Sequence, residues 1–258
     1  MKTLRISLLA AVLSFLYLPV LVLILYSFNA SRFAAGWEGF SFRWYEAMFR
    51  SPENLRALAN TGIVSVISTL CATVLGTLLA LGLYRYRFRG KEWVETLLYL
   101  PVIVPEMVTA VSMLAFFVAI QATLGKTTII LAHIAFQISF VTLTVRARLQ
   151  HFPANLIEAA RDLGAGTQAL GREVLWPLLR PGIISGALLA FSLSVDDFLI
   201  TYFTAGVGDS TLPVRMYALI RRGVTPEVNA LSALMLMVSF LTLFISLRTV
   251  RTANESPR

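Results

Sequence analysis

Three carboxylates lie within or beside long apolar stretches of this 258-residue chain. Asp196 and Asp197 are adjacent, and Glu106 directly follows Pro105. A carboxylate inside a membrane helix costs about 2.5–3.5 kcal/mol on insertion scales, so it usually faces a cavity or a polar partner. Proline before Glu106 distorts the helix, which is tolerated where the opened backbone lines a cavity. All three are therefore candidates for a path that attracts cations. The alternatives are solvation at a helix end for the pair, and a helix cap or interhelical hydrogen bond for Glu106.

The residues before the aspartate pair form a stripe of small side chains. A small residue recurs at every fourth position, in the series Gly182, Gly186, Ala190 and Ser194. Membrane helices pack closely through such stripes. At about 100° per residue, Asp197 falls in the middle of the stripe and is expected to point into the protein, while Asp196 points away. The two carboxylates share a direction only if the helix opens there.

The composition excludes several classes of protein. Apolar residues make up 57% of the chain and charged residues 14%, against about 45–50% and about 25% in soluble domains. This excludes a conventional soluble enzyme, a disordered protein and a nucleic-acid-binding domain, so no nucleic acid is expected as a partner. The single cysteine, Cys71, excludes a disulfide framework and a Cys-based metal site. His133 and His151 have no helical metal-ligand spacing, and a packing or loop role is expected for them.

Six stretches are long enough to cross a bilayer, because about 20 apolar residues span about 30 Å of hydrocarbon. They predict an all-α polytopic membrane protein, a single transmembrane domain over residues 1–258. Its helices are expected at about 7–28, 61–84, 95–120, 127–145, 182–204 and 228–248. The first stretch exceeds the apolar region of a signal peptide, so we expect a retained helix, bent at Pro19.

The basic residues predict the orientation in the membrane. The net charge is +8, and four cations follow the second helix within seven residues: Arg85, Arg87, Arg89 and Lys91. Lys and Arg gather in cytoplasmic loops. The bias favours cytoplasmic N- and C-termini, with residues 146–181 as a cytoplasmic loop, although four arginines in the first outer loop weaken it.

The cytoplasmic loop carries a predicted pair of short helices. Gly164 is expected as the left-handed residue that ends the first of them, and the second is expected to end before Trp176–Pro177. Ala160 lies on an apolar face of small residues that lets another protein approach closely. The alternative, which spacing alone favours, is an ordinary amphipathic loop helix.

The same loop resembles the EAA signature of ABC-importer permeases. Glu158-Ala159-Ala160 is followed by Gly164 and then by Val174-Leu175-Trp176-Pro177, with Trp176 in place of the usual Leu. The resemblance implies a type I ABC-importer permease fold of six transmembrane helices, whose loop docks as a coupling helix into a separate ATP-binding subunit. It assigns the ATPase contact to Glu158, Ala159, Ala160, Arg161, Asp162 and Gly164.

Seven fragments in order along the chain resemble the spermidine/putrescine importer permeases. They are YSFNASRF (26–33), WYEAMF (44–49), ALGLYRYRFRGK (80–91), AHIAF (132–136), EAARDLGA (158–165), LSVDDFLI (193–200) and TPEVNAL (225–231). This resemblance implies alternating-access import of polyamines across the bacterial cytoplasmic (inner) membrane. The substrate path would include Asp196, Asp197, Glu106, Ser194, Trp44 and Tyr45. The two aromatic residues would offer cation–π contact at the outer entrance, and the alternative for them is an interfacial aromatic belt.

The resemblance also implies the partners. They are a homologous second permease subunit, two ATP-binding cassette subunits that bind ATP and Mg, a periplasmic polyamine-binding protein and the lipid membrane. No catalytic residue, metal or cofactor is expected on this chain. Gly125-Lys126-Thr127 is not a phosphate loop, because Ile120 replaces the required glycine.

Three other functions remain open. The nearest is the same architecture with another substrate, such as an opine, an amino acid or a metal complex. A proton-coupled secondary transporter would use the same carboxylates but would leave the coupling loop unexplained. A membrane enzyme is disfavoured, because no His, Cys or Ser constellation accompanies the carboxylates.

Overall fold

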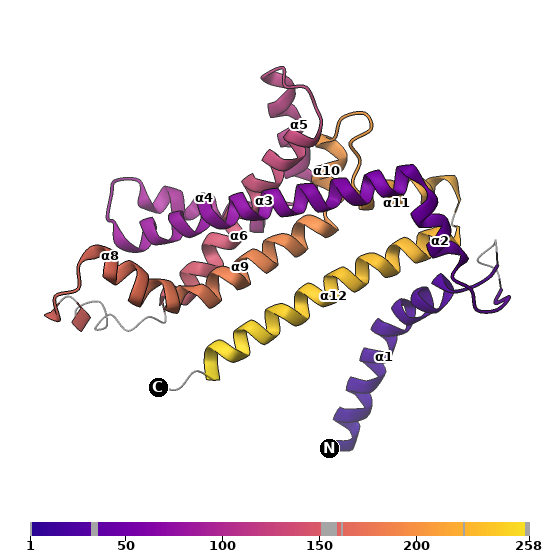
Figure 1. Ribbon diagram of the computed structural model, residues 1–258, viewed down its shortest axis with the longest axis horizontal. Coiled ribbons are helices and arrows are strands. Elements are labelled where there is room, and N and C mark those ends of the chain that lie inside the picture. Colours follow the sequence, from indigo (N-terminus) through magenta and orange to yellow (C-terminus); the bar gives the residue numbers. More distant parts are fainter. Residues whose placement is uncertain (1, 32–35, 151–158, 161, 224, 256–258) are drawn as a thin grey trace. The chain divides into compact units, whose positions relative to one another are not determined.

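The computed structural model describes residues 2–31, 36–150, 159–160, 162–223 and 225–255 (Figure 1). Regular structure in these ranges is helical, apart from one isolated β-bridge between Asn29 and Phe40. The predicted all-α class is confirmed. The chain divides into two compact units, Met1–Ala59 with Thr211–Val238 and Asn60–Ser210 with Ser239–Arg258, and each is described by itself.

Among the described residues, five helices are long and apolar enough to cross a membrane. These are Thr3–Ser27, Pro52–Arg85, Lys126–Gln150, Leu170–Asp196 and Pro226–Arg248. The bent pair α4 (Lys91–Ile103) and α5 (Glu106–Ala119) meets at 112° and makes a sixth if it is one span. The chain is a multi-pass membrane protein, as its apolar stretches predict.

The continuous helix expected over 95–120 is two helices. Val104 and Pro105 have extended backbone, with ψ angles of 133° and 132°, and they separate α4 from α5. The proline ring clashes with a helical conformation of the residue before it, so Val104 leaves the helix. Glu106 therefore becomes the first residue of α5, at the corner between the two helices.

The helix expected over 182–204 begins earlier and breaks before its expected end. A helical run starts with α8 (Thr167–Ala169), continues through a π-helical stretch, Leu170–Leu175, and becomes α9 (Trp176–Asp196). The expected stop before Trp176–Pro177 is wrong. The π-to-α junction lies there, so the hydrogen-bond pattern changes where proline lacks its amide donor. With α6 (Lys126–Gln150) also longer than expected, the loop predicted over 146–181 is shorter.

The first unit contains α1 (Lys2–Ser27), α2 (Arg43–Arg50) and α11 (Leu212–Arg222), with the start of α3 (Pro52–Arg85) and of α12 (Pro226–Glu255). Its core is formed by Met48, Ala57, Leu212 and Leu231. Arg215 of α11 ties the helix starts together. Its guanidinium bonds Glu53 at 2.6 Å and Asn54 at 3.1 Å, and the Asn54 amide donates to Glu227 at 2.6 Å.

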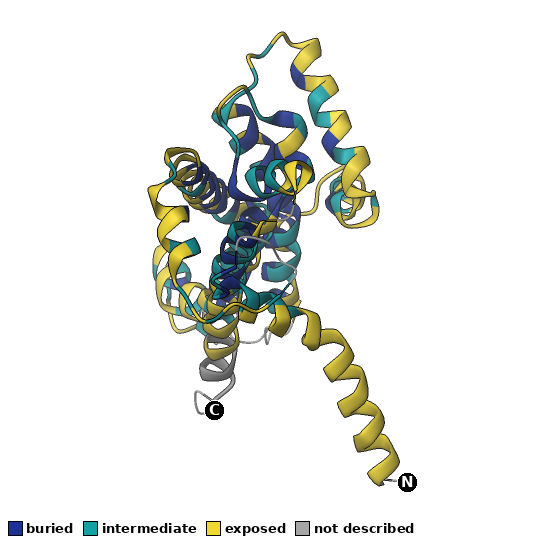
Figure 2. Cartoon of the chain, turned by 90° about the vertical axis from the view of Figure 1, so that its right-hand side faces the viewer, coloured by how far each residue is buried: buried dark blue, intermediate teal, exposed yellow. Residues whose placement is uncertain are grey.

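Helix α1 is apolar and exposed. Each side chain from Thr3 to Pro19 is exposed, and the helix leading to the N-terminus is coloured as exposed along its length in Figure 2. It continues through Pro19 without a break. Such a surface requires lipid or another subunit around it.

The second unit holds the rest of α3, α4, α5, α6, α9 and α10 (Leu199–Thr204). Helix α6 packs against α9 and α4, and α10 packs against α5 and α6. One core cluster joins Ala80, Val141, Val145, Leu149, Leu179 and Ala190. A second joins Ala110, Phe117, Ala132, Phe136 and Ile200. The small-residue stripe of α9 is buried as predicted, in the series Gly182, Gly186, Ala190 and Ser194.

Gly76 lets α3 approach α6 closely. A Cβ atom at Gly76 would lie 2.8 Å from Cβ of Val141 and 3.1 Å from the carbonyl oxygen of Ile138. The Thr142 hydroxyl also donates to the Gly76 carbonyl oxygen, at 3.2 Å. Even one methyl group at this position would force the two helices apart.

We expect Gly76→Ala to destabilise the protein by about 1–3 kcal/mol, because it overpacks a close helix contact. The apparent melting temperature in detergent measures this. Gly82→Ala is the matched control on the same helix, since nothing lies within 4 Å of a Cβ there, and alanine favours the helix. Equal melting temperatures for the two variants would contradict the close contact.

Candidate cation-binding site

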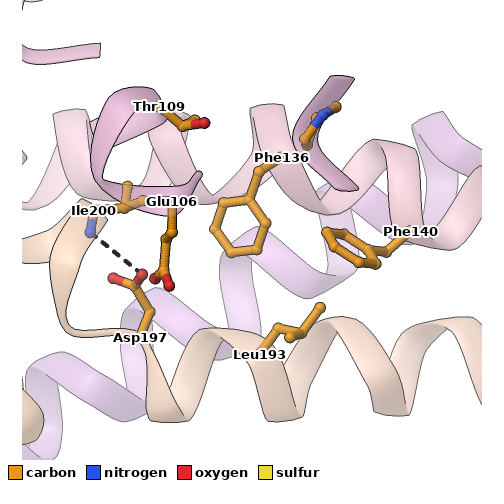
Figure 3. A pocket seen from close by; sticks show the side chains of 8 residues that line it. Glu106, Thr109, Phe136, Phe140, Leu193, Asp197 and Ile200 are labelled. Carbon is orange, nitrogen blue, oxygen red and sulfur yellow. Dashed lines mark hydrogen bonds between the residues drawn. The ribbon is translucent and has the colours of Figure 1, made fainter. Parts of the chain in front are cut away.

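A pocket of about 160 Å³ lies within the second unit (Figure 3). Its lining comes from α4, α5, α6, α9 and α10, and the residues are Pro101, Glu106, Thr109, Phe136, Phe140, Leu193, Asp197 and Ile200. Two carboxylates, one hydroxyl and a mainly apolar wall thus face the same space. The pocket is smaller than the roughly 300–1,000 Å³ of a whole small-molecule site, and its volume suits one charged group with a few attached methylenes.

Glu106 and Asp197 direct their carboxylates toward one another in this pocket (Figure 3). Each lies at a helix break. Glu106 starts α5 after the Pro105 corner, and Asp197 follows the last residue of α9 with a ψ angle of 126°. Two facing carboxylates repel each other unless a proton or a cation lies between them. Breaks in two helices therefore create a place that favours a cation.

The Asp197 carboxylate is buried, with 2% of its side chain exposed. It accepts hydrogen bonds from the amides of Ile200, at 3.3 Å, and Thr201, at 2.8 Å, and from the Thr201 hydroxyl at 2.7 Å. These bonds satisfy the free amides at the start of α10. Because Asp197 leaves the helix, its carboxylate and that of Asp196 take different surroundings.

His133 contacts the same oxygen of this carboxylate, Oδ2, as Thr201 does. Its Nε2 lies 3.2 Å from Oδ2 of Asp197 and 3.0 Å from Oγ1 of Thr201, and its Nδ1 lies 2.7 Å from Oγ of Ser194. A carboxylate only accepts, so the Nε2–H group of His133 is the donor to Asp197. The ring is fully buried.

The packing or loop role predicted for His133 is therefore incomplete, because the residue directly contacts a carboxylate of the pocket. The sequence spacing of possible metal ligands could not reveal this contact, because the partners of His133 are not a set of metal ligands. The available signal was a titratable side chain inside a predicted membrane span, which is a functional candidate by itself.

The other predicted path residues lie elsewhere. Asp196 is exposed, and its two carboxylate oxygens accept from the Ser239 hydroxyl of α12 at 3.0 and 3.1 Å. It does not line the pocket, in agreement with the predicted direction of Asp196 away from the small-residue stripe. Ser194 is buried against His133 and supports the site without lining it.

Trp44 and Tyr45 belong to the first unit. The indole nitrogen of Trp44 donates to the carbonyl oxygens of Asn29 and Ser31, at 2.9 and 3.2 Å. The Tyr45 hydroxyl lies 2.7 Å from Oγ of Ser27. The guanidinium of Arg43 lies over the Trp44 ring, 5.0 Å from its centroid, so this ring already has a cation on one face.

The predicted coupling residues are partly described. Glu158 and Arg161 lie outside the described residues, whereas Ala159, Asp162 and Gly164 are exposed and Ala160 is half-buried. Gly164 has a φ angle of +84°, and the Ala165 amide donates to the Ala160 carbonyl oxygen at 2.9 Å. This is the hydrogen bond of a helix end closed by a left-handed glycine, as predicted for Gly164.

The expectation that no His or Ser side chain accompanies the carboxylates is wrong, because the His133 ring lies between Ser194 and Asp197. Within the part of the chain that the structure describes, no three His, Cys, Asp or Glu side chains are placed to hold a metal ion. The pocket presents two acceptors of positive charge beside phenylalanine and leucine side chains. Its chemistry suits a ligand with an ammonium group and an apolar body.

Comparison with known proteins identifies the family. Residues 72–255 match the model of the family described as "Binding-protein-dependent transport system inner membrane component". The chain belongs to this family. It is therefore a membrane component of a transport system, an ABC-transporter permease rather than an enzyme.

Two relatives illustrate the similarity in sequence. The chain is 38% identical, over 98% of both chains, to the spermidine/putrescine transport system permease protein PotC of Haemophilus influenzae. It is 36% identical to the putrescine transport system permease protein PotI of Escherichia coli K12, covering 95% of this chain and 91% of that protein.

The fold of this chain resembles that of a bacterial ABC transporter involved in the import of the acidic polysaccharide alginate. The TM-score is 0.69 at 19% identity, with 100% of this chain and 96% of that chain covered. It also resembles the MetNI methionine ABC transporter, with a TM-score of 0.65 at 23% identity and coverage of 77% and 95%. The predicted type I ABC-importer permease fold is confirmed.

We expect His133→Leu and Asp197→Asn to be non-additive in stability, because each removes a partner of the other. Each single variant should lose about 1–3 kcal/mol by leaving a buried polar group unsatisfied. The double variant should lose clearly less than the sum. Melting temperatures of the four proteins in detergent measure the coupling, and simple additivity would show that the ring and the carboxylate do not support each other.

Proposed function

We propose that this chain is the transmembrane permease subunit of an ATP-driven importer that moves polyamines, such as spermidine and putrescine, across the cytoplasmic membrane by alternating access. The pairing of the Glu106 and Asp197 carboxylates in an apolar-walled pocket is the observation that carries the proposal. The similarity to the spermidine/putrescine and putrescine permeases supports the choice of substrate.

A polyamine matches this pocket chemically. It presents ammonium groups separated by short methylene chains, so it needs both carboxylates and an apolar wall. An ammonium between Glu106 and Asp197 would relieve the repulsion of the two carboxylates, and its methylenes would contact Phe136, Phe140 and Leu193. Charge pairing in such a partly dehydrated site is stronger than in water.

The two carboxylates have different roles in this proposal. Asp197 is already bonded by two amides, a hydroxyl and the His133 ring, so its position is fixed. Glu106 forms no ion pair with any described residue and is exposed on this chain, so its longer side chain can follow the cation. Asp197 sets the geometry, and Glu106 contributes the adjustable charge.

The partners follow from the same proposal. A homologous second permease subunit would complete the pore, and a periplasmic polyamine-binding protein would deliver the substrate. Two ATP-binding cassette subunits would hold ATP and Mg and contact the segment that ends at Gly164. Both termini would be cytoplasmic, with the basic residues after α3 on the same side.

An uptake assay tests the proposed substrate. It measures the entry of labelled spermidine and putrescine into vesicles that contain the chain with its partner subunits. Glu106→Gln should lower uptake at least tenfold, because it removes one of the two charges that bind the ammonium, and Glu106→Asp should keep part of it. Glu46→Gln is the control, since Glu46 is exposed and pairs only with Arg50 on α2.

The outcomes separate the remaining functions. Uptake that needs ATP and is inhibited by unlabelled spermidine supports the proposal, whereas inhibition by a neutral amino acid instead would replace the substrate. Uptake driven by a proton gradient without ATP would indicate a secondary transporter. Normal polyamine uptake by Glu106→Gln would remove this carboxylate from the substrate path.

We expect Gly164→Ala to reduce ATP hydrolysis stimulated by the binding protein. A side chain is strained at a φ angle of +84°, so the helix end at Gly164 would change shape. Gly166→Ala is the matched control, because Gly166 has no such backbone angle and has free space at its Cβ position. Equal stimulation in both variants would argue against an ATPase contact here.

A further inference from the structure

The connection between α3 and α4 forms a hollow of about 490 Å³ that has no part in the pocket described above. Its cations are Arg87, Arg89 and Lys91, its aromatic residues are Phe88 and Trp93, and Glu92 is its one carboxylate. Each residue from Tyr84 to Gly90 is exposed. We call residues 85–93 the basic loop.

The positive charge of the basic loop is largely uncompensated. Lys91 lies 4.0 Å from Glu95, but Glu95 is also bonded by Arg146 at 2.9 Å. Within the described ranges, Arg87 and Arg89 have no acidic partner. Guanidinium groups bind phosphate oxygens through paired hydrogen bonds, so two of them in one hollow favour a phosphate group.

The basic loop directly follows the apolar part of α3. No charged residue occurs from Ala57 to Tyr84, so the apolar part of α3 ends where Arg85 begins the loop. Three aromatic side chains here are exposed: Tyr86 by 64%, Phe88 by 48% and Trp93 by 76%. Exposed aromatic rings beside the end of a span are typical of the headgroup level of a bilayer.

These observations favour a lipid over a free anion. Arginines without an acidic partner can bind a phosphate group, and the exposed aromatic rings can contact the apolar chain of the same lipid. A free phosphate would use the arginines alone and would leave the rings in water. A protein surface with acidic residues would also neutralise the positive charge. The loop follows the apolar part of α3, however, and basic residues beside the end of a span are typical of anionic lipid binding.

We propose that the basic loop binds the headgroup phosphate of an anionic phospholipid, with Arg87 and Arg89 on the phosphate and Phe88 and Trp93 against the lipid chain. This site is separate from the substrate pocket and does not depend on which substrate is transported. It gives the bent α4–α5 pair, which carries Glu106, an anchor in the membrane surface.

Native mass spectrometry tests the proposal. The transporter is purified with its partner subunits and titrated with phosphatidylglycerol or phosphatidylethanolamine. Phosphatidylglycerol should be retained preferentially at low salt. The variant Arg87→Gln/Arg89→Gln should weaken its retention about thirtyfold, since each basic residue near a membrane surface contributes about 1 kcal/mol. Trp93→Ala should weaken it a few-fold, and Arg87→Lys/Arg89→Lys should keep most of it.

Arg221→Gln/Arg222→Gln is the matched control, because it removes an exposed arginine pair at the end of α11 in the other unit. Equal retention of the two lipids, or equal loss in the control, would overturn the proposal. Displacement of phosphatidylglycerol by millimolar inorganic phosphate, with no effect of Trp93→Ala, would assign the hollow to free phosphate. Release of the ATP-binding subunits with unchanged lipid retention would assign it to a protein contact.

Discussion

The buried carboxylate of Asp197 is the constraint on which the site depends. Removing a charge from water is costly unless hydrogen bonds replace the water, and two helices, α6 and α10, supply them. Helix α10 offers two amides and the Thr201 hydroxyl, α6 offers the His133 ring, and α9 places Ser194 behind that ring. The same bonds that stabilise the carboxylate therefore hold α6, α9 and α10 together beside the pocket.

The pocket exists because two membrane helices are interrupted. Helix ends leave amides and carbonyls without partners, which in lipid is tolerated only where protein or a cavity satisfies them. At Asp197 the carboxylate satisfies the amides of α10, and at Pro105 the corner exposes Glu106. Continuous helices would have kept both carboxylates on separate surfaces.

Close packing of small residues gives the frame its rigidity. Gly76 brings α3 against α6, and Gly186 lies 3.4 Å from Val141 at the position of its absent Cβ. Without a hydrophobic force between helices inside a bilayer, such contacts and buried hydrogen bonds carry the association. Glu106 lies at a corner outside this close packing and forms no ion pair with any described residue.

The sequence by itself determined the all-α membrane class and the approximate place of most spans. A composition with 57% apolar residues requires helices in lipid, the stripe from Gly182 to Ser194 predicted the buried face of α9, and Gly164 predicted a helix end. Each of these depends on local spacing or on the total apolar content, which the linear sequence contains. Helical periodicity also distinguished Asp197, predicted to point into the protein, from Asp196, predicted to point away, and the structure has Asp197 buried and Asp196 exposed.

Only the tertiary structure decided which carboxylates meet. Glu106 and Asp197 are 91 residues apart in the sequence, and they face one another because Pro105 bends one span and the backbone opens after Asp196. His133 gained its role in the same way, from the packing of α6 on α9 and α10. Contacts between distant segments depend on how helices pack and where they break, and the periodicity of residues along the chain does not predict that geometry.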